Sequence, residues 1–289
     1  MTQYTTPIIN KTVLMSGPRY FGVEELNPFE NKNYQPDPDI ALREFLEIKK
    51  ALERAGITVI KVDEPEYCQD GIFTANWGLC RGDLHVLSSL PEQRKNEEPY
   101  AEKILQGLGK KVIKPPYRFS GQGDALPCGD LLFAGMGYRN DPRVHQFLTD
   151  TFGFKVIGVQ AVPLYDDNGK PAINKVTGLP DSYFYDIDLA ISILRKDLIA
   201  WCPEALMPDS QKVMRELPGI DKIEVSLEEA MNFGCNLVST GSTVIMGSKT
   251  PNLKAAIESH GLNVVTVEIN ELSKAGGFIR CTTLTLDNE

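Results

Sequence analysis

The sequence predicts an α/β fold in which about five strand–strand–helix–strand units are arranged around a common axis. Helical segments begin near residues 41, 99, 142, 209 and 251, and each is followed at once by a short β-branched run. Further strand-like runs lie in pairs between these helices. A unit of this kind cannot bury its own apolar face, so repeated units are expected to stack around an axis.

An ordinary doubly wound α/β sheet is the alternative interpretation of the same pattern. The sequence has no G-x-G-x-x-G motif after a strand and no phosphate-binding P-loop, which are typical of many doubly wound sheets. We therefore favour the pseudo-symmetric arrangement. The units share no visible sequence identity, so the predicted repeat is architectural.

The clearest helix is residues 40–55, because Phe45, Leu46 and Leu52 recur with helical spacing and Gly56 can end the helix. The other expected helices are 100–108, 142–152, 210–217 and 251–260. Short β-branched or apolar runs predict strands at 12–15, 57–62, 71–75, 84–88, 111–113, 131–134, 155–159, 184–189, 198–201, 222–225, 236–239, 243–246 and 263–267.

Composition excludes several classes of protein. The net charge of −9 argues against a nucleic-acid partner, which needs a concentrated positive patch. No apolar run approaches the length of a membrane span, and residues 1–11 lack the apolar core of a signal peptide. The six cysteines form no C-x-x-C pair and fit reduced thiols, so we expect a cytoplasmic protein with no metal and no cofactor.

A glycine-rich segment near the C-terminus is the first candidate for chemistry. Gly276 and Gly277 permit positive φ and a close approach to a ligand. Arg280 could favour the thiolate of Cys281, which is the nucleophilic form of cysteine. The alternative is a turn into a final strand with a buried cysteine.

Asp186 and Asp188 form the second candidate. In a strand, residues two apart project from one face, so both carboxylates would share a site within an apolar and aromatic run. Such a pair raises one pKa or binds a cation, whereas on an edge strand both would simply be solvated. A metal site is the weakest interpretation, because two carboxylates are too few ligands.

Three further segments carry polar residues beside glycine turns. Residues 69–79 contain Asp70 and Asn76, and residues 119–125 form a loop of small and polar side chains. Arg139 follows an expected strand, where its planar fork would suit a substrate carboxylate, although it could equally form a surface ion pair.

Taken in order, these segments resemble the guanidino-group-modifying superfamily, also called penteins. The resemblance is strongest to dimethylarginine dimethylaminohydrolases, amidinotransferase-like proteins and arginine dihydrolases. It implies a single domain over residues 1–289, folded as a five-bladed α/β propeller of ββαβ units. It is carried by residues 13–21, 23–28, 70–79, 121–125, 135–139 and 276–281.

The resemblance also implies roles for individual residues. Cys281 corresponds to the nucleophile that attacks the guanidinium carbon, forming a covalent adduct that water or an acceptor amine resolves. Asp188 corresponds to the acid of a His-x-Asp pair. The residues implied in substrate binding are Asp70, which would face the guanidinium, Asn27 and Asn76, which would lie at the substrate, and Arg139, which would hold a carboxylate.

Two positions depart from the family pattern. Asp186 stands where the family has histidine, which removes the usual proton carrier. Ser120 stands where many members have glutamate, which removes charge that should hold a guanidinium. None of the three histidines has the spacing to substitute; they are His85, His145 and His260.

The sequence thus leaves two functions open. The first is a cysteine-dependent hydrolase or amidinotransferase acting on an arginine-like guanidino compound, with Asp186 as a shared-proton acid. The second is a non-catalytic pentein that binds a small ligand or partner. A small guanidino compound is the expected ligand, without nucleic acid or membrane, and a homo-oligomer is possible.

Overall fold

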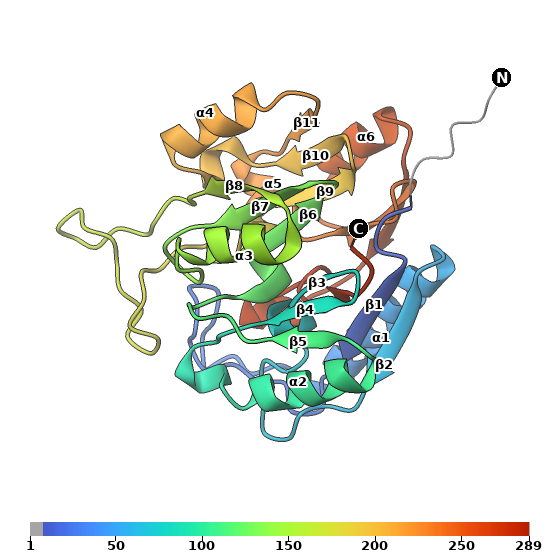
Figure 1. Cartoon of the computed structure of the whole chain (residues 1–289), viewed down its shortest axis with the longest axis vertical. Coiled ribbons are helices and arrows are strands. Elements are labelled where there is room, and N and C mark those ends of the chain that lie inside the picture. Colours follow the sequence, from blue (N-terminus) through green and yellow to red (C-terminus); the bar gives the residue numbers. More distant parts are fainter. Residues whose placement is uncertain (1–7, 289) are drawn as a thin grey trace.

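The computed structural model describes residues 8–288 and contains five three-stranded sheets. Each sheet has two antiparallel strands, then a helix, then a third strand parallel to the second (Figure 1). In order, the units are β15 (Leu284–Thr285), β1 (Thr12–Ser16), α1 (Pro38–Arg54) and β2 (Thr58–Val62); β3 (Gly78–Arg81), β4 (Leu84–Leu87), α2 (Glu97–Gly107) and β5 (Lys111–Ile113); β6 (Ala125–Cys128), β7 (Leu131–Gly135), α3 (Val144–Phe152) and β8 (Lys155–Val159); β9 (Ile191–Arg195), β10 (Leu198–Trp201), α4 (Pro208–Glu216) and β11 (Asp221–Glu224); and β12 (Val238–Ser239), β13 (Thr243–Gly247), α6 (Pro251–Ser259) and β14 (Asn263–Val267).

This arrangement confirms the predicted five-unit α/β propeller. The first strands of neighbouring units contact one another, as β6 does with β9 and β9 with β12, so these strands lie around the axis. The first two strands of each unit are largely buried, whereas the third is partly exposed. Figure 1 shows α1, α2, α4 and α6 around the periphery.

Helix α1 shows why a predicted helix forms where it does. The Asp37 carboxylate accepts hydrogen bonds from the backbone N–H groups of Asp39 and Ile40 and so caps the first turn. Pro38 stands at the first helical position, where its missing N–H costs nothing. Phe45 and Leu52 lie on the buried face, and Gly56 follows the end of the helix with a φ of 89°.

Two strand predictions are wrong. The expected strand at 71–75 is a bend that enters a 3₁₀ helix, η1 (Thr74–Trp77), and the strand begins only at Gly78. The expected strand at 184–189 is a turn into another 3₁₀ helix, η4 (Ile187–Leu189), and its unit's first strand is β9. Both segments have buried apolar residues, and their hydrogen bonds are those of tight turns.

Other elements carried no expectation from the sequence. The short helix α5 (Leu227–Met231) is capped by the Ser226 hydroxyl, which accepts from the N–H of Glu229. Among residues 8–288, no helix combines the length and apolar character needed to cross a membrane. That residues 1–289 form a single domain stays a prediction.

Candidate active site

One cavity brings together most of the residues singled out in the sequence. It has a volume of about 400 Å³, part of it open to solvent. Asp188 does not line it and lies fully buried behind Cys281. The predicted residues in its wall are Asn27, Asp70, Asn76, Arg139, Asp186 and Cys281.

Cys281 is held by polar partners on both sides. Its Sγ atom lies 3.4 Å from Asp188 Oδ2 and 3.2 Å from Asn236 Nδ2. The Asn236 Oδ1 atom accepts from the backbone N–H groups of Arg280 and Cys281. The Cys281 carbonyl accepts from the N–H of Ala75, which ties this loop to η1. The thiol is therefore fixed in one orientation at the cavity wall.

The paired glycines before this loop are required by close packing. Gly276 has a φ of 76°, and a Cβ there would lie 2.5 Å from Asn27 Oδ1. A Cβ on Gly277 would lie 2.2 Å from the Phe73 ring. Side chains at either position would displace the cavity wall, which agrees with the close approach expected from the sequence.

The two aspartates occupy different positions on one tight turn. Asp186 precedes η4 and faces the cavity, whereas Asp188 lies within η4 and contacts the thiol. The turn is held by Asp124, whose Oδ1 accepts from the N–H of Ile187 at 2.9 Å. Burial, then the charge of Asp186, raises the pKa of Asp188.

Ser120 and Asp186, the two residues that depart from the family pattern, are hydrogen-bonded to each other. Ser120 Oγ donates to Asp186 Oδ1 at 3.0 Å, and Asn76 Nδ2 donates to Asp186 Oδ2 at 2.8 Å. Gly123 makes this approach possible, because a Cβ there would lie within 2.7 Å of both Asn76 and Asp186. Gln122 points elsewhere and accepts from the N–H of Thr285.

Burial and negative charge dominate the electrostatics around Cys281. Burial, then the charge of Asp188, raises the pKa of Cys281, so the thiol form is favoured in the empty site. Burial also raises the pKa of Asp186, although Arg139 and the two hydrogen bonds oppose the rise. A positive charge in the cavity would favour both the thiolate and the ionised carboxylates.

A buried arginine that the sequence did not single out completes the far wall. Arg94 donates from Nε and Nη2 to the two carboxylate oxygens of Glu97, and from Nη1 to Asn76 Oδ1. Its Nε lies 3.6 Å from Asp70 Oδ2. Burial raises the pKa of Asp70 to about 7, and Arg94 opposes that rise. Arg94 lies in a stretch of mostly charged and polar residues, a sequence pattern that is typical of a solvent-exposed surface.

Replacing Glu97 with glutamine is expected to lower the free energy of unfolding by about 3 to 5 kcal/mol, because it leaves the buried Arg94 charge without its bidentate partner. Urea denaturation measures the change. Glu224→Gln is the matched control, since the Arg215–Glu224 pair is half exposed and should contribute at most about 1 kcal/mol. Equal effects of the two substitutions would contradict this account.

Arg139 and Asn27 form the mouth of the cavity. Arg139 Nη2 donates to the Leu26 carbonyl at 3.0 Å, and its guanidinium lies 4.8 Å from the centre of the Tyr185 ring. The Tyr185 hydroxyl donates to the Gly276 carbonyl. Asn27 Nδ2 donates to the Ala275 carbonyl at 2.9 Å. Tyr185 and Asn236 are therefore two further residues that the sequence did not predict as parts of the site.

Among the described residues, no histidine lines the cavity. His85 is buried elsewhere, 3.1 Å from Cys80 Sγ, and burial lowers its pKa to about 3. No group of three or more His, Cys, Asp or Glu side chains within residues 8–288 is arranged to hold a metal ion. Asp186 and Asp188 therefore belong to no such group.

Comparison with known proteins agrees with the fold. Residues 18–287 match the family described as N,N dimethylarginine dimethylhydrolase, eukaryotic. The chain belongs to this family. The match covers every strand except β1 and includes every residue described in the cavity wall.

Two relatives extend the comparison to named enzymes. The chain is 27% identical to an N(G),N(G)-dimethylarginine dimethylaminohydrolase of Mycobacterium tuberculosis, over 94% of this chain and 84% of that protein. It is 29% identical to AgrE of Nostoc, a bifunctional arginine dihydrolase/ornithine cyclodeaminase, over 94% of this chain and 37% of that protein. These relatives support cysteine-dependent hydrolysis of guanidino compounds in the family.

A solved structure shares the architecture. The product-bound N-terminal domain of ArgZ, an arginine dihydrolase from cyanobacteria, superposes with a TM-score of 0.84 at 26% identity. The superposition covers 94% of this chain and 96% of that domain.

Proposed function

We propose that this protein hydrolyses the guanidino group of an arginine-like compound through a covalent adduct on Cys281. The observation that carries the proposal is Cys281 in a cavity wall, close to two buried carboxylates that form no ion pair among the described residues. Asp70 is already paired with Arg94, and none of the ion pairs within residues 8–288 includes Asp186 or Asp188. A guanidinium in the cavity would supply the missing positive charge.

The proposed reaction begins with the substrate lowering the pKa of the thiol. Cys281 Sγ gives its proton to Asp188 and forms a bond to the guanidinium carbon. The bond from that carbon to one nitrogen then breaks, and the amine leaves with a proton from Asp186, whose pKa is raised by burial. Water adds to the adduct with Asp186 as base, Sγ leaves and recovers its proton, and a urea remains.

The contact between Ser120 and Asp186 supports retention of a guanidinium site. The family pattern has a glutamate at the position of Ser120 and a histidine at the position of Asp186, whereas this chain has a carboxylate only at position 186. The exchange moves the negative charge within one hydrogen-bonded pair and keeps it in the cavity. Asp70 would face the guanidinium of the substrate, and Arg139 would hold its carboxylate. The side chains of Asn27 and Asn76 would also lie at the substrate.

The test is incubation of the full chain with arginine, methylated arginines and other guanidino compounds, with and without acceptor amines. We expect release of ammonia or an amine, a urea product, and a mass increase on the Cys281 peptide when the reaction is quenched early. Guanidino transfer to an added amine would identify an amidinotransferase. Binding of these compounds without product or adduct would overturn the proposal in favour of a non-catalytic pentein.

A further inference from the structure

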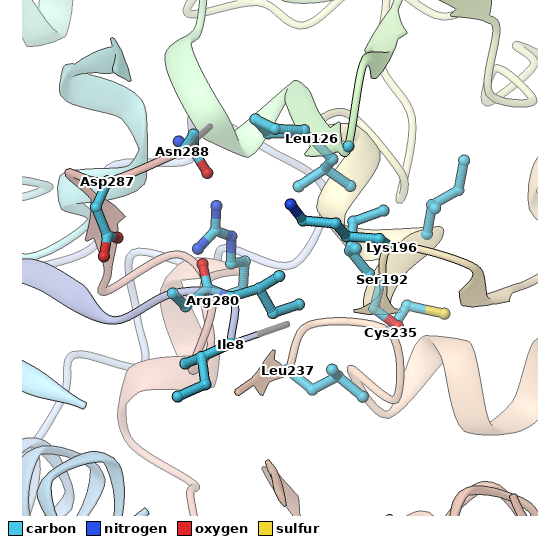
Figure 2. Close-up of a pocket in the computed structure, with 15 residues that line it drawn as sticks. Ile8, Leu126, Ser192, Lys196, Cys235, Leu237, Arg280, Asp287 and Asn288 are labelled. Carbon is cyan, nitrogen blue, oxygen red and sulfur yellow. The ribbon is translucent and has the colours of Figure 1, made fainter. Parts of the chain in front are cut away.

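A second cavity lies on the other side of the segment that carries the nucleophile. It has a volume of about 660 Å³, part of it open to solvent, and shares no wall residue with the first cavity. Cys281 lines the first cavity and the preceding residue, Arg280, lines the second. Figure 2 shows this cavity between the segment that contains Ile8, the C-terminal Asp287 and Asn288, and the residues around Ser192.

Arg280 is the most unusual group in its wall. The residue is 6% exposed, and the hydrogen bond that its side chain makes among residues 8–288 runs from Nη1 to Thr285 Oγ1 at 3.0 Å. No carboxylate of the described residues lies within ion-pair distance of it. In Figure 2 its guanidinium extends into the open space. Burial lowers the pKa of Arg280, and the negative charges of Asp188 and Cys281 oppose this only in part, so an anion placed here would relieve an existing cost.

A second buried polar group faces the same space. Ser192 is 3% exposed, and its hydroxyl has no hydrogen-bond partner in the described part of the chain. Buried hydroxyls are nearly always satisfied, so this one points to a missing acceptor or donor. Lys196 also extends toward the cavity in Figure 2, whereas Asp287 lies on the opposite side.

The remaining wall is mainly aliphatic. Asp287 limits how much negative charge a ligand can carry, and its Oδ1 already accepts from the N–H of Thr12. The apolar residues of the wall include Ile8, Ile9, Leu126, Ile191, Ile193 and Leu237.

We propose that this cavity binds a small organic monocarboxylate with an aliphatic or aromatic body. The planar fork of Arg280 matches a carboxylate with two parallel hydrogen bonds, and the Ser192 hydroxyl donates a third. The apolar body of the ligand packs on the aliphatic wall. The proposal does not rest on the reaction proposed above, because the two cavities share no wall residue.

The test uses hexanoate and benzoate as probes of the full chain, with hexylamine, hexanol and inorganic phosphate as controls. Calorimetry and thermal unfolding measure binding without reference to activity. We expect the two carboxylates to bind at about millimolar concentration or tighter and to raise the unfolding temperature, and the controls to do neither. Failure of both carboxylates at 10-fold higher concentration, about 10 mM, would overturn the proposal.

Variants at the two cavities test which cavity binds the carboxylate. Arg280→Met should weaken carboxylate binding at least about 10-fold, since it removes charge-assisted hydrogen bonds. Replacing an unpaired buried charge with an apolar side chain of similar size should leave the protein folded. Ile193→Trp keeps Arg280, fills the cavity and should also abolish binding. Arg139→Gln is the control for the first cavity and should bind as the unaltered chain does; a loss of binding confined to Arg139→Gln would contradict the proposal.

Discussion

Replacing Cys281 with serine is expected to lower the rate of guanidino hydrolysis at least about 1,000-fold, because a hydroxyl is a far weaker nucleophile than a thiolate at neutral pH. The substitution should also abolish the covalent adduct. The measurement is steady-state turnover of the best substrate found, together with the mass of the Cys281-containing peptide after a rapid quench. Substrate affinity should change little, because the carboxylates that would hold the guanidinium remain.

The matched control is Cys68→Ser, at a cysteine that is partly exposed and lies outside the cavity wall. It should leave turnover unchanged. The serine at position 281 can still accept from Asn236 and donate to Asp188, so the unfolding midpoint should shift little. Turnover by Cys281→Ser within a few-fold of the unaltered chain would refute the covalent mechanism.

Restoring both family residues together is expected to change activity far more than restoring either alone. Asp186→His leaves an imidazole beside Ser120 without a carboxylate to orient it, and Ser120→Glu places two carboxylates side by side. In the double variant S120E/D186H, a glutamate and a histidine face each other. We expect the double variant to turn over arginine or methylated arginines about 100-fold faster than either single variant.

A double-mutant cycle on kcat/KM measures this coupling, which we expect to be about 1 to 3 kcal/mol. S120Q/D186H is the control, since glutamine has the shape of glutamate without its charge, and it should not recover the gain. Additive effects of the two substitutions would mean that Ser120 and Asp186 changed independently, against the direct contact between them.

The outer parts of the fold were predictable from the sequence because they obey simple periodicity. Helix α1 shows a clear amphipathic pattern with a capping residue at one end and glycine at the other. The first strands β15, β6 and β9 were not predicted, and each is largely buried. The partner of β15 is β1, at the other end of the described chain, which local sequence does not encode, whereas β6 and β9 form hairpins with β7 and β10.

The site was predictable where residue type and glycine spacing implied close approach, as at Gly276 and Cys281. It was not predictable where function depends on long-range packing. Arg94 stands among charged residues that look solvated, yet Glu97 and Asn76 bury its guanidinium. The two aspartates were expected on one face of a strand. The 3₁₀ turn instead places Asp186 in the cavity wall and Asp188 in contact with the Cys281 thiol.

The pairing of β15 with β1 joins the two ends of the described chain. Leu284 faces Leu14 and Thr285 faces Val13 across an antiparallel ladder, so this contact spans nearly the whole length of the polypeptide. During synthesis the first sheet cannot be completed until β15 has been made, because β1 pairs with it. We therefore expect closure of the ring to be a late and slow step of folding. Cys281 lies three residues before that strand. A chain that stops short of Cys281 would therefore leave the ring open and also lack the thiol of the proposed reaction.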